Sequence, residues 1–272
     1  MARRNPAGMG HGHHHGPCRE STRRRYLGQS GDRRFCKVSD ITLQRTAIEP
    51  LAANVHRARF SIPEALTWQA GQYLQLKVPG VADAFFSIAC APGRGELELH
   101  IEAHPEQTRA CAVMDWLRQH DQVQALLPLG RCYLPELPEG EVVLAVAGTG
   151  FSQAKAICED LFARGFEHPV TLYWGGRTLE DLYWKALPEQ WQSAHTNFAF
   201  VPLAEGAIEG AWEGHHAALI SAMRCDRHDW PRASLVACGS PNLAYGVLDA
   251  AAACGLSEAR FYSDVLEYAP RG

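Results

Sequence analysis

The stretch that decides the fold is Val142-Val143-Leu144-Ala145-Val146-Ala147-Gly148-Thr149-Gly150-Phe151-Ser152. Its first six residues are continuously apolar, which is typical of a strand that is buried on both faces of a parallel sheet. The two glycines let backbone N–H groups approach an anion, and the helix expected over 153–164 adds the positive end of its dipole. This order is typical of a phosphate-binding loop at the edge of a doubly wound sheet, and G-T-G alone is equally compatible with a plain tight turn. No Walker lysine follows, which disfavours an ATPase.

Downstream of this stretch, short apolar runs alternate with helical patterns. The expected strands are 170–174, 198–201, 235–238 and 260–262, and the expected helices are 179–191, 215–223 and 243–254. Strands that alternate with helices of this length predict an α/β domain with a parallel, doubly wound sheet over 138–272.

Upstream, the sequence shows short β-like runs that are separated by glycine and proline. The expected strands are 37–43, 55–60, 73–78, 85–89, 97–101, 123–127 and 132–134, and one helical pattern covers 108–120. Many short strands with a single helix predict a small antiparallel β-barrel over 36–137. The fold class is therefore two-domain, with an N-terminal barrel and a C-terminal α/β domain.

Residues 1–35 form a separate basic and histidine-rich segment that we expect to be disordered. The first 36 residues hold eight arginines and only two acids, although the whole chain has a net charge of −4. His11, His13, His14 and His15 with Cys18 could hold a metal ion. We favour a purification remnant or a start codon placed too early, because a floppy segment lacks an ordered second ligand shell. No metal centre is therefore predicted.

The overall composition excludes several classes of protein. A negative net charge argues against a general nucleic-acid binder. The sequence contains no run of eighteen apolar residues, so no membrane-spanning helix is predicted. The N-terminus lacks the apolar core of a secretory signal. The nine cysteines are dispersed and form no C-x-x-C pair, so we expect reduced thiols in the cytoplasm and no iron–sulfur cluster.

Two further strand ends carry candidate functional residues. Cys238 and Gly239 end one predicted strand, and a cysteine at the tip of a parallel strand faces the ligand crevice unless it is simply a core thiol. Gly176 and Arg177 end another predicted strand, where the arginine could meet a phosphate or ribose, or remain solvated.

Several motifs in register resemble the ferredoxin–NADP⁺ reductase superfamily over about residues 36 to 266. They are W-Q-A-G-Q-Y-L-Q-L, F-F-S-I-A, E-L-E-L-H-I, V-A-G-T-G-F-S-Q-A, L-Y-W-G-G-R-T-L-E-D-L-Y, A-C-G-S-P and F-Y-S-D. G-T-G-F-S-x-A and Y-W-G-G-R are similar to bacterial NAD(P)H:flavin reductases, including those that serve luminescence, and to related sugar-deoxygenation reductases. The latter carry a ferredoxin-like segment with clustered cysteines that this chain lacks.

The resemblance implies that the barrel holds a flavin (FAD, FMN or riboflavin) and the α/β domain holds NADH or NADPH. Hydride would pass from nicotinamide C4 to flavin N5, with Ser87, Cys238 and Asp264 as the implied catalytic residues. The residues implied at the flavin are Phe85, Phe86, Ser87, Ile88, Ala89, His100, Ile101 and Glu102. Those implied at the nucleotide are Gly148, Thr149, Gly150, Phe151, Ser152, Gly176, Arg177, Cys238, Gly239 and Pro241.

The sequence also departs from the family pattern. Ala84 stands where the family has the arginine that meets the flavin phosphate or ribityl chain, so we predict weak flavin retention. Ala147 replaces the first glycine of G-G-T-G, and Leu266 stands where an aromatic residue often follows the acidic residue. Glu205 follows the third strand of the α/β domain, and its carboxylate would repel a 2′-phosphate, which favours NADH.

Three functions remain open from the sequence. The main one is a flavin reductase that hands free reduced flavin to a partner such as a flavin-dependent oxygenase, or reduces iron through it. The second is an electron-transfer component with bound flavin that serves a separate ferredoxin or oxygenase. The third is a catalytically silent protein that senses flavin or nucleotide.

Overall fold

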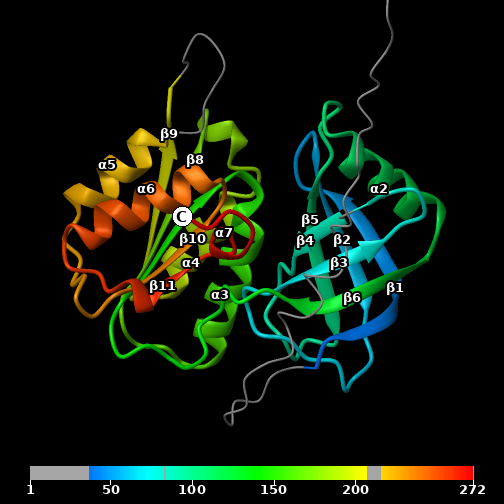
Figure 1. Cartoon of the computed structure of the whole chain (residues 1–272), viewed down its shortest axis with the longest axis horizontal. Helices are drawn as coiled ribbons and strands as arrows, with labels where there is room; N and C mark the ends of the chain where they lie inside the picture. The colour runs from blue at the N-terminus through cyan, green and yellow to red at the C-terminus, as the bar shows by residue number, and fades with distance from the viewer. Residues whose placement is uncertain (1–36, 83, 207–215, 272) are drawn as a thin grey trace, which may run out of the picture. The chain divides into compact units, whose positions relative to one another are not determined.

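A computed structural model describes residues 37–82, 84–206 and 216–271 of the chain (Figure 1). These residues belong to one compact unit, Cys36–Gly272. The prediction of a disordered tail, and the histidines considered there as metal ligands, lie outside the described residues.

The N-terminal half of this unit forms a six-stranded antiparallel sheet in the order β4-β3-β6-β1-β2-β5. Its strands are β1 (Ser39–Pro50), β2 (Val55–Ser61), β3 (Tyr73–Lys77), β4 (Ala84–Ser87), β5 (Glu96–Glu102) and β6 (Gln122–Leu129). An antiparallel bridge between Ile88 and Leu99 joins the two edges. The sheet is thereby almost closed into a barrel, as predicted.

The barrel interior is apolar, because alternate residues of each strand point inward. Phe60, Leu74 and Leu97 are fully buried there. The helix α2 (Thr108–Gln119) adds Val113, Met114 and Leu117 to the same cluster.

The C-terminal half forms a five-stranded parallel sheet in the order β11-β10-β7-β8-β9. Its strands are β7 (Val142–Ala147), β8 (Val170–Gly176), β9 (Phe198–Ala204), β10 (Ser234–Cys238) and β11 (Phe261–Tyr262). From β7 the chain proceeds to β8 on one side and later returns to β10 on the other. The switch point of the sheet therefore lies between β7 and β10, where ligands bind in folds of this kind.

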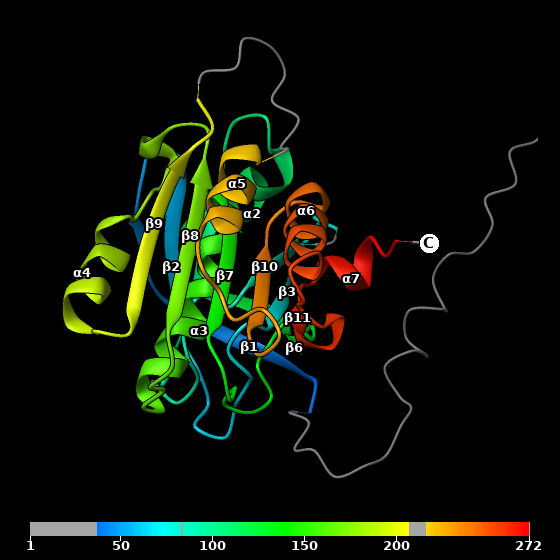
Figure 2. The ribbon, with the colours of Figure 1, turned by 90° about the vertical axis from the view of Figure 1, so that its left-hand side faces the viewer.

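Helices cover both faces of the parallel sheet (Figure 2). The helices α3 (Phe151–Ala163) and α4 (Ala186–Ala194) lie on one face, and α5 (Ala217–Cys225) and α6 (Pro241–Ala252) lie on the other. Leu144 packs toward α3, and its neighbours Val143 and Ala145 pack toward α5 and α6. This double burial explains the continuous apolar run of β7.

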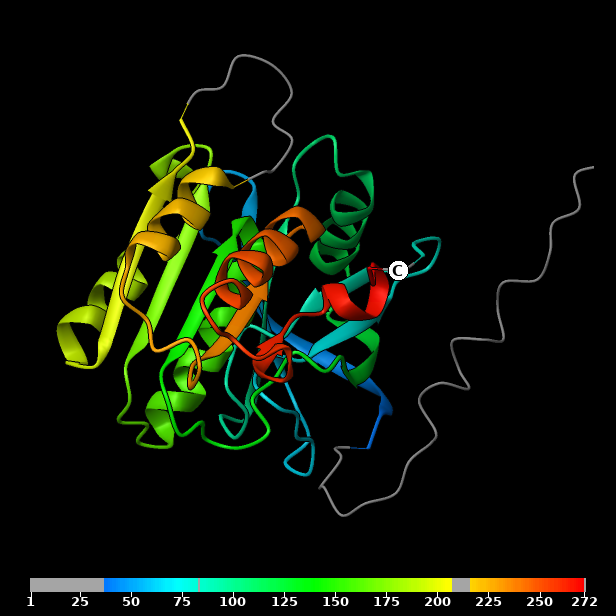
Figure 3. The same cartoon turned by 60° about the vertical axis from the view of Figure 1, so that its left-hand side comes forward.

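The last element is the short helix α7 (Val265–Tyr268). Figure 3 shows it, in red, on the side of the parallel sheet that faces the barrel. No helix among the described residues combines the length and apolar character that a membrane crossing requires.

Two predicted elements are wrong. Residues 132–134 form no strand, because the Tyr133 N–H turns back to the Arg131 carbonyl at 2.9 Å and leaves the ladder. The helix expected over 179–191 is divided into a 3₁₀ turn (Leu179–Asp181) and α4. The Asp181 carboxylate accepts a hydrogen bond from the Thr178 N–H at 2.9 Å, a capping box that closes the first turn on itself.

The central strand sets the stability of the parallel sheet. Leu144 is 0% exposed, whereas Leu137, in the segment between the two sheets, is 37% exposed. We expect Leu144→Ala to lower the free energy of unfolding by about 2–5 kcal/mol because it leaves a cavity. The matched variant Leu137→Ala should cost less than about 1 kcal/mol. Urea unfolding followed by circular dichroism measures both, and similar losses would contradict the burial of β7.

Candidate active site

A cavity of about 240 Å³ lies between the barrel and the carboxyl edge of the parallel sheet. Ser87 comes to its wall from the end of β4, and Cys238 comes from the end of β10. The remaining lining residues are Phe85, Phe86, His100, Thr149, Gly150, Ser152, Gln153, Ala237, Gly239, Ser263, Asp264, Val265 and Tyr268. The two residues on which the enzyme hypothesis depends most thus share one cavity.

The other residues expected at the site do not contribute to the wall of this cavity as the structure describes it. They are Ile88, Ala89, Ile101, Glu102, Gly148, Phe151, Gly176, Arg177 and Pro241. Ile88, Ala89 and Ile101 are fully buried. The Ile88 N–H donates to the Gln72 carbonyl at 3.0 Å, and the Ala89 N–H donates to the Glu98 carbonyl at 2.7 Å. These two donors are already bound within the protein.

Two aromatic side chains pack beneath the Gly148–Gly150 turn. Phe151 stacks on Trp174 with ring centroids 3.9 Å apart. The Trp174 indole N–H donates to the Gly148 carbonyl at 3.2 Å. Phe151 therefore acts below the loop, as support, while Thr149 and Gly150 face the cavity.

Gly150 is required by a close approach of two chain segments. A Cβ atom at this position would lie 2.2 Å from the Cys238 carbonyl oxygen. Only glycine lets the turn after β7 pack directly on the end of β10, on either side of the switch point. This contact places Thr149 and Cys238 on one wall.

Asp264 is the titratable carboxyl group of the cavity. Burial raises its pKa to about 7, although a hydrogen bond from Gln153 opposes the shift. The Gln153 amide donates to Asp264 Oδ2 at 2.8 Å. The other oxygen, Oδ1, is buried and lacks a well-aligned hydrogen-bond partner among the described residues. Asp264 can therefore hold or release a proton near neutral pH.

A second thiol lies behind Cys238. A hydrogen bond between Cys132 and Cys238, together with burial, raises the pKa of the Cys132 thiol well above its usual value. Both cysteines are free. Cys132 therefore stays protonated and is a poor nucleophile, so it supports Cys238 by packing.

Sequence reasoning missed Tyr268. The family pattern often has an aromatic residue just past the acidic one, where this chain has Leu266, but α7 brings Tyr268 to the cavity wall instead. The Tyr268 side chain is 64% exposed, and its hydroxyl donates to the Gly239 carbonyl at 3.4 Å. The spacing of four residues from Asp264 was the available signal, because it places both residues on one side of a helical turn.

The structure also shows the surroundings of Ala84, which stands where the family has an arginine. Ala84 is 1% exposed and belongs to the barrel core. The adjacent Phe85 is instead exposed, lines the cavity and meets Tyr73 edge-to-face with ring centroids 5.8 Å apart. This end of β4 therefore offers an aromatic surface to a ligand.

The raised pKa of Asp264 predicts a pH-dependent stability. Between pH 3.8 and about 7 the folded protein retains a proton that the unfolded chain releases. The free energy of unfolding therefore falls as pH rises through this window and levels off above it. Asp264→Asn removes the effect, so we expect its stability relative to the wild type to rise by about 3 kcal/mol between pH 5 and pH 8. Urea unfolding of both proteins at pH 5 and pH 8 measures the difference, and an unchanged difference would exclude the shift.

Comparisons with known proteins agree with this geometry. The family model described as the oxidoreductase NAD-binding domain matches residues 144–249. The NAD(P)H-flavin reductase of Aliivibrio fischeri is 33% identical over 197 residues, which cover 70% of this chain and 80% of that protein. Reductase component 1 of terephthalate 1,2-dioxygenase from Comamonas sp is 25% identical over 217 residues, which cover 79% of this chain and 64% of that protein.

Solved structures give the same fold. The Amycolatopsis cytochrome P450 reductase superposes with a TM-score of 0.72 and 27% identity, covering 84% of this chain and 69% of that one. A ferredoxin–NADP⁺ reductase from Plasmodium falciparum superposes with a TM-score of 0.69 at 15% identity, covering 82% of this chain and 94% of that one. The latter likeness concerns the fold alone. The chain belongs to the ferredoxin–NADP⁺ reductase superfamily, in which NAD(P)H-flavin reductases are among its relatives.

Proposed function

We propose that this protein is an NAD(P)H-dependent flavin reductase that transfers a hydride from nicotinamide C4 to flavin N5. The observation that carries the proposal is the shared cavity, with Ser87 on the barrel side and Cys238 on the side of the parallel sheet. The sequence similarity to proteins named NAD(P)H-flavin reductase supports it. The barrel part, 36–137, would hold the flavin, and the part over 138–272 would hold the nucleotide.

The residues present fit a flavin and a pyridine nucleotide. The exposed Phe85 and Tyr268 offer flat apolar surfaces to a ring system. Thr149 and Gly150 open a helix N-terminus toward the cavity, which suits the pyrophosphate of a dinucleotide. When bound, the flavin supplies the electrophilic ring atom that accepts the hydride.

The protein contributes orientation, exclusion of water and proton control. The Ser87 hydroxyl can donate a hydrogen bond at the reacting edge of the ring. Cys238, buried at the opposite side, shapes the place for the nicotinamide. Asp264, with its pKa near 7, can hold a proton close to the reacting atoms. We place this activity in the cytoplasm, because the described cysteines are free thiols.

A second candidate is an electron-transfer component with bound flavin that serves a ferredoxin or an oxygenase. The observation that favours it is the similarity to reductase components of terephthalate dioxygenase and phenol monooxygenase. Flavin retention discriminates the two candidates, because such a component keeps its flavin through each turnover.

We predict that flavin acts as a diffusible substrate. No arginine stands at position 84 to bind the flavin phosphate, and a charge-assisted contact of that kind contributes about 1.5–3 kcal/mol. The purified protein should carry far less than one flavin per chain, and added riboflavin, FMN or FAD should accelerate NADH oxidation in air. A stoichiometric yellow protein that is active without added flavin would favour the second candidate. Absence of activity with flavin and with ferredoxin would indicate a silent binding protein.

We further predict a preference for NADH over NADPH. Glu205 lies beside the end of β8, where its N–H donates to the Gly176 carbonyl at 3.0 Å. Its carboxylate accepts from the Ala218 N–H at 2.9 Å, so a negative charge occupies the N-terminus of α5. A 2′-phosphate at this edge would be repelled.

The test compares kcat/KM for the two coenzymes in the wild type and in Glu205→Gln. The wild type should favour NADH, and the substitution should narrow the ratio about tenfold, which corresponds to about 1.4 kcal/mol. Glu189→Gln, on the exposed side of α4, serves as the matched control. Equal use of both coenzymes by the wild type would refute the assignment.

A further inference from the structure

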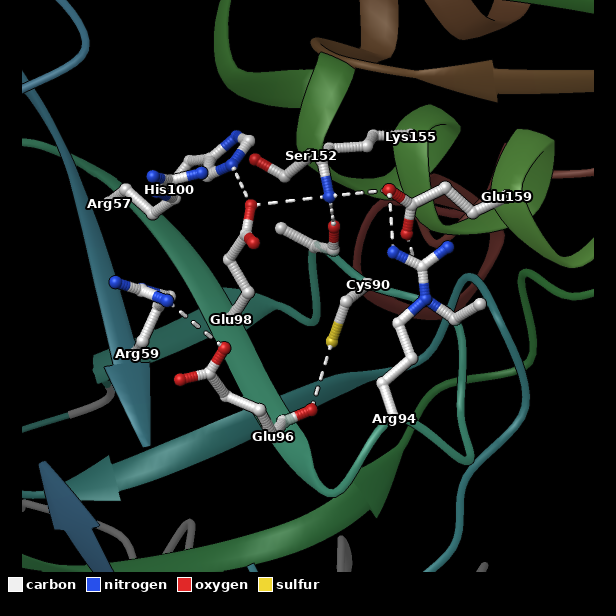
Figure 4. A network of polar contacts seen from close by, with 12 residues as sticks. Arg57, Arg59, Cys90, Arg94, Glu96, Glu98, His100, Ser152, Lys155 and Glu159 are labelled. Carbon is white, nitrogen blue, oxygen red and sulfur yellow. Dashed lines mark hydrogen bonds and ion pairs between the residues drawn. The ribbon is translucent and has the colours of Figure 1, made fainter. Parts of the chain in front are cut away.

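A buried cluster of charged side chains joins the barrel to α3 at one side of the cavity (Figure 4). Its centre is Lys155, which is 3% exposed. The Lys155 ammonium donates to the Ala89 carbonyl at 2.8 Å. It also pairs with Glu98 on β5 at 3.2 Å and with Glu159 on α3 at 2.9 Å. All three protons of the ammonium therefore have an acceptor.

The charges in this cluster balance without a protonated histidine. Lys155 and Arg94 face Glu98 and Glu159, with Arg94 3.4 Å from Glu159. His100 lies between Glu98, at 2.7 Å, and the Tyr183 hydroxyl, at 2.8 Å. Burial lowers the pKa of His100 although Glu98 opposes the shift, so the imidazole is neutral near pH 7 and holds Glu98 in place.

The cluster connects the two halves of the proposed reaction. Lys155 lies in the second turn of α3, which begins directly after the Gly148-Thr149-Gly150 turn. Ala89, whose carbonyl it binds, is two residues beyond Ser87. A second hydrogen bond joins the same barrel segment to α3, because the Ala91 N–H donates to the Glu159 carboxylate at 3.2 Å. The flavin side and the nucleotide side of the cavity are thus tied by the Lys155 ammonium and, beside it, by the Glu159 carboxylate.

We infer that Lys155 is a positioning residue that fixes the spacing between the Ser87 segment and the Gly148–Gly150 turn, and hence between the two rings. The inference rests on the proposed function. An apolar contact would let the helix slide along the barrel, whereas an ammonium with two barrel acceptors in fixed directions, the Ala89 carbonyl and the Glu98 carboxylate, favours one arrangement. Buried ion clusters add little net stability compared with apolar packing, so geometric specificity is the stronger reason for this one.

The position of the rings matters because hydride transfer requires reacting atoms about 3–3.5 Å apart, and a displacement of about 1 Å can slow a reaction about 100-fold. Loss of Lys155 should therefore slow the chemical step more than it weakens binding. A larger effect on the rate of hydride transfer than on ligand binding distinguishes a positioning role from a purely structural one.

The test uses the full chain and single-turnover mixing of NADH with protein and saturating riboflavin. Lys155→Met removes the ammonium, and Lys155→Arg keeps the charge and most of the donors. The triple variant K155M/E98Q/E159Q removes the buried charges together, which guards against misfolding caused by unpaired carboxylates. Arg164→Met is the matched control, because Arg164 pairs with Asp160 at 3.0 Å at the far end of the same helix.

We expect K155M, or the triple variant if K155M does not fold, to lower the rate of hydride transfer roughly 10- to 100-fold. The dissociation constants for NADH and riboflavin should change less than about threefold. The kinetic isotope effect with 4-deuterated NADH should remain, while the charge-transfer absorbance of the mixed complex weakens. Lys155→Arg should recover much of the rate, and Arg164→Met should match the wild type.

Two results with an active wild type would overturn this inference alone. An active wild type together with folded K155M and triple variants that transfer hydride at its rate would refute the role of Lys155 and leave the proposed function intact. A loss that appears in ligand binding alone, with an unchanged transfer rate, would do the same. A wild type that does not reduce flavin with NADH would instead remove the proposed function, and this inference with it.

Discussion

The arrangement of the cavity depends on one steric constraint, the contact between Gly150 and the Cys238 carbonyl. No side-chain atom fits between the turn after β7 and the end of β10, because a Cβ would stand 2.2 Å from that oxygen. The contact draws together two segments that are about ninety residues apart in the chain. This contact fixes the positions of Thr149 and Cys238 relative to each other on one wall of the cavity. The barrel supplies the opposite wall.

That opposite wall is held by polar contacts, which is unusual for so buried an interface. Nearly the whole of α3 up to Glu159 is buried, including Ser152, Gln153 and Lys155. Gln153 donates to the Gly71 carbonyl and to Asp264, and so links barrel, helix and the C-terminal segment. Directional contacts of this kind define an orientation, whereas apolar area alone defines only proximity.

Much of the fold followed from the sequence, because its signals are local. The boundaries of β7 agree with the prediction, since the six apolar residues of the run stand between Glu141 and Gly148. The single helix predicted over 179–191 is wrong because the Asp181 carboxylate accepts a hydrogen bond from the Thr178 N–H and ends the first turn early. Hydrophobic periodicity does not reveal this capping interaction. The cluster around Lys155 was also missed. Its partners Ala89 and Glu98 lie more than fifty residues away, and a lone lysine in a helical pattern normally indicates a solvated face.

The ionisation of Asp264 near neutrality has a practical consequence for work on this protein. Below about pH 7 the carboxyl is neutral, and above it the cavity gains a negative charge next to the place proposed for an anionic dinucleotide. Affinities recorded in mildly acidic and mildly alkaline buffers would therefore describe two electrostatic forms of the same pocket. Comparisons among ligands are meaningful only when every measurement shares one buffer.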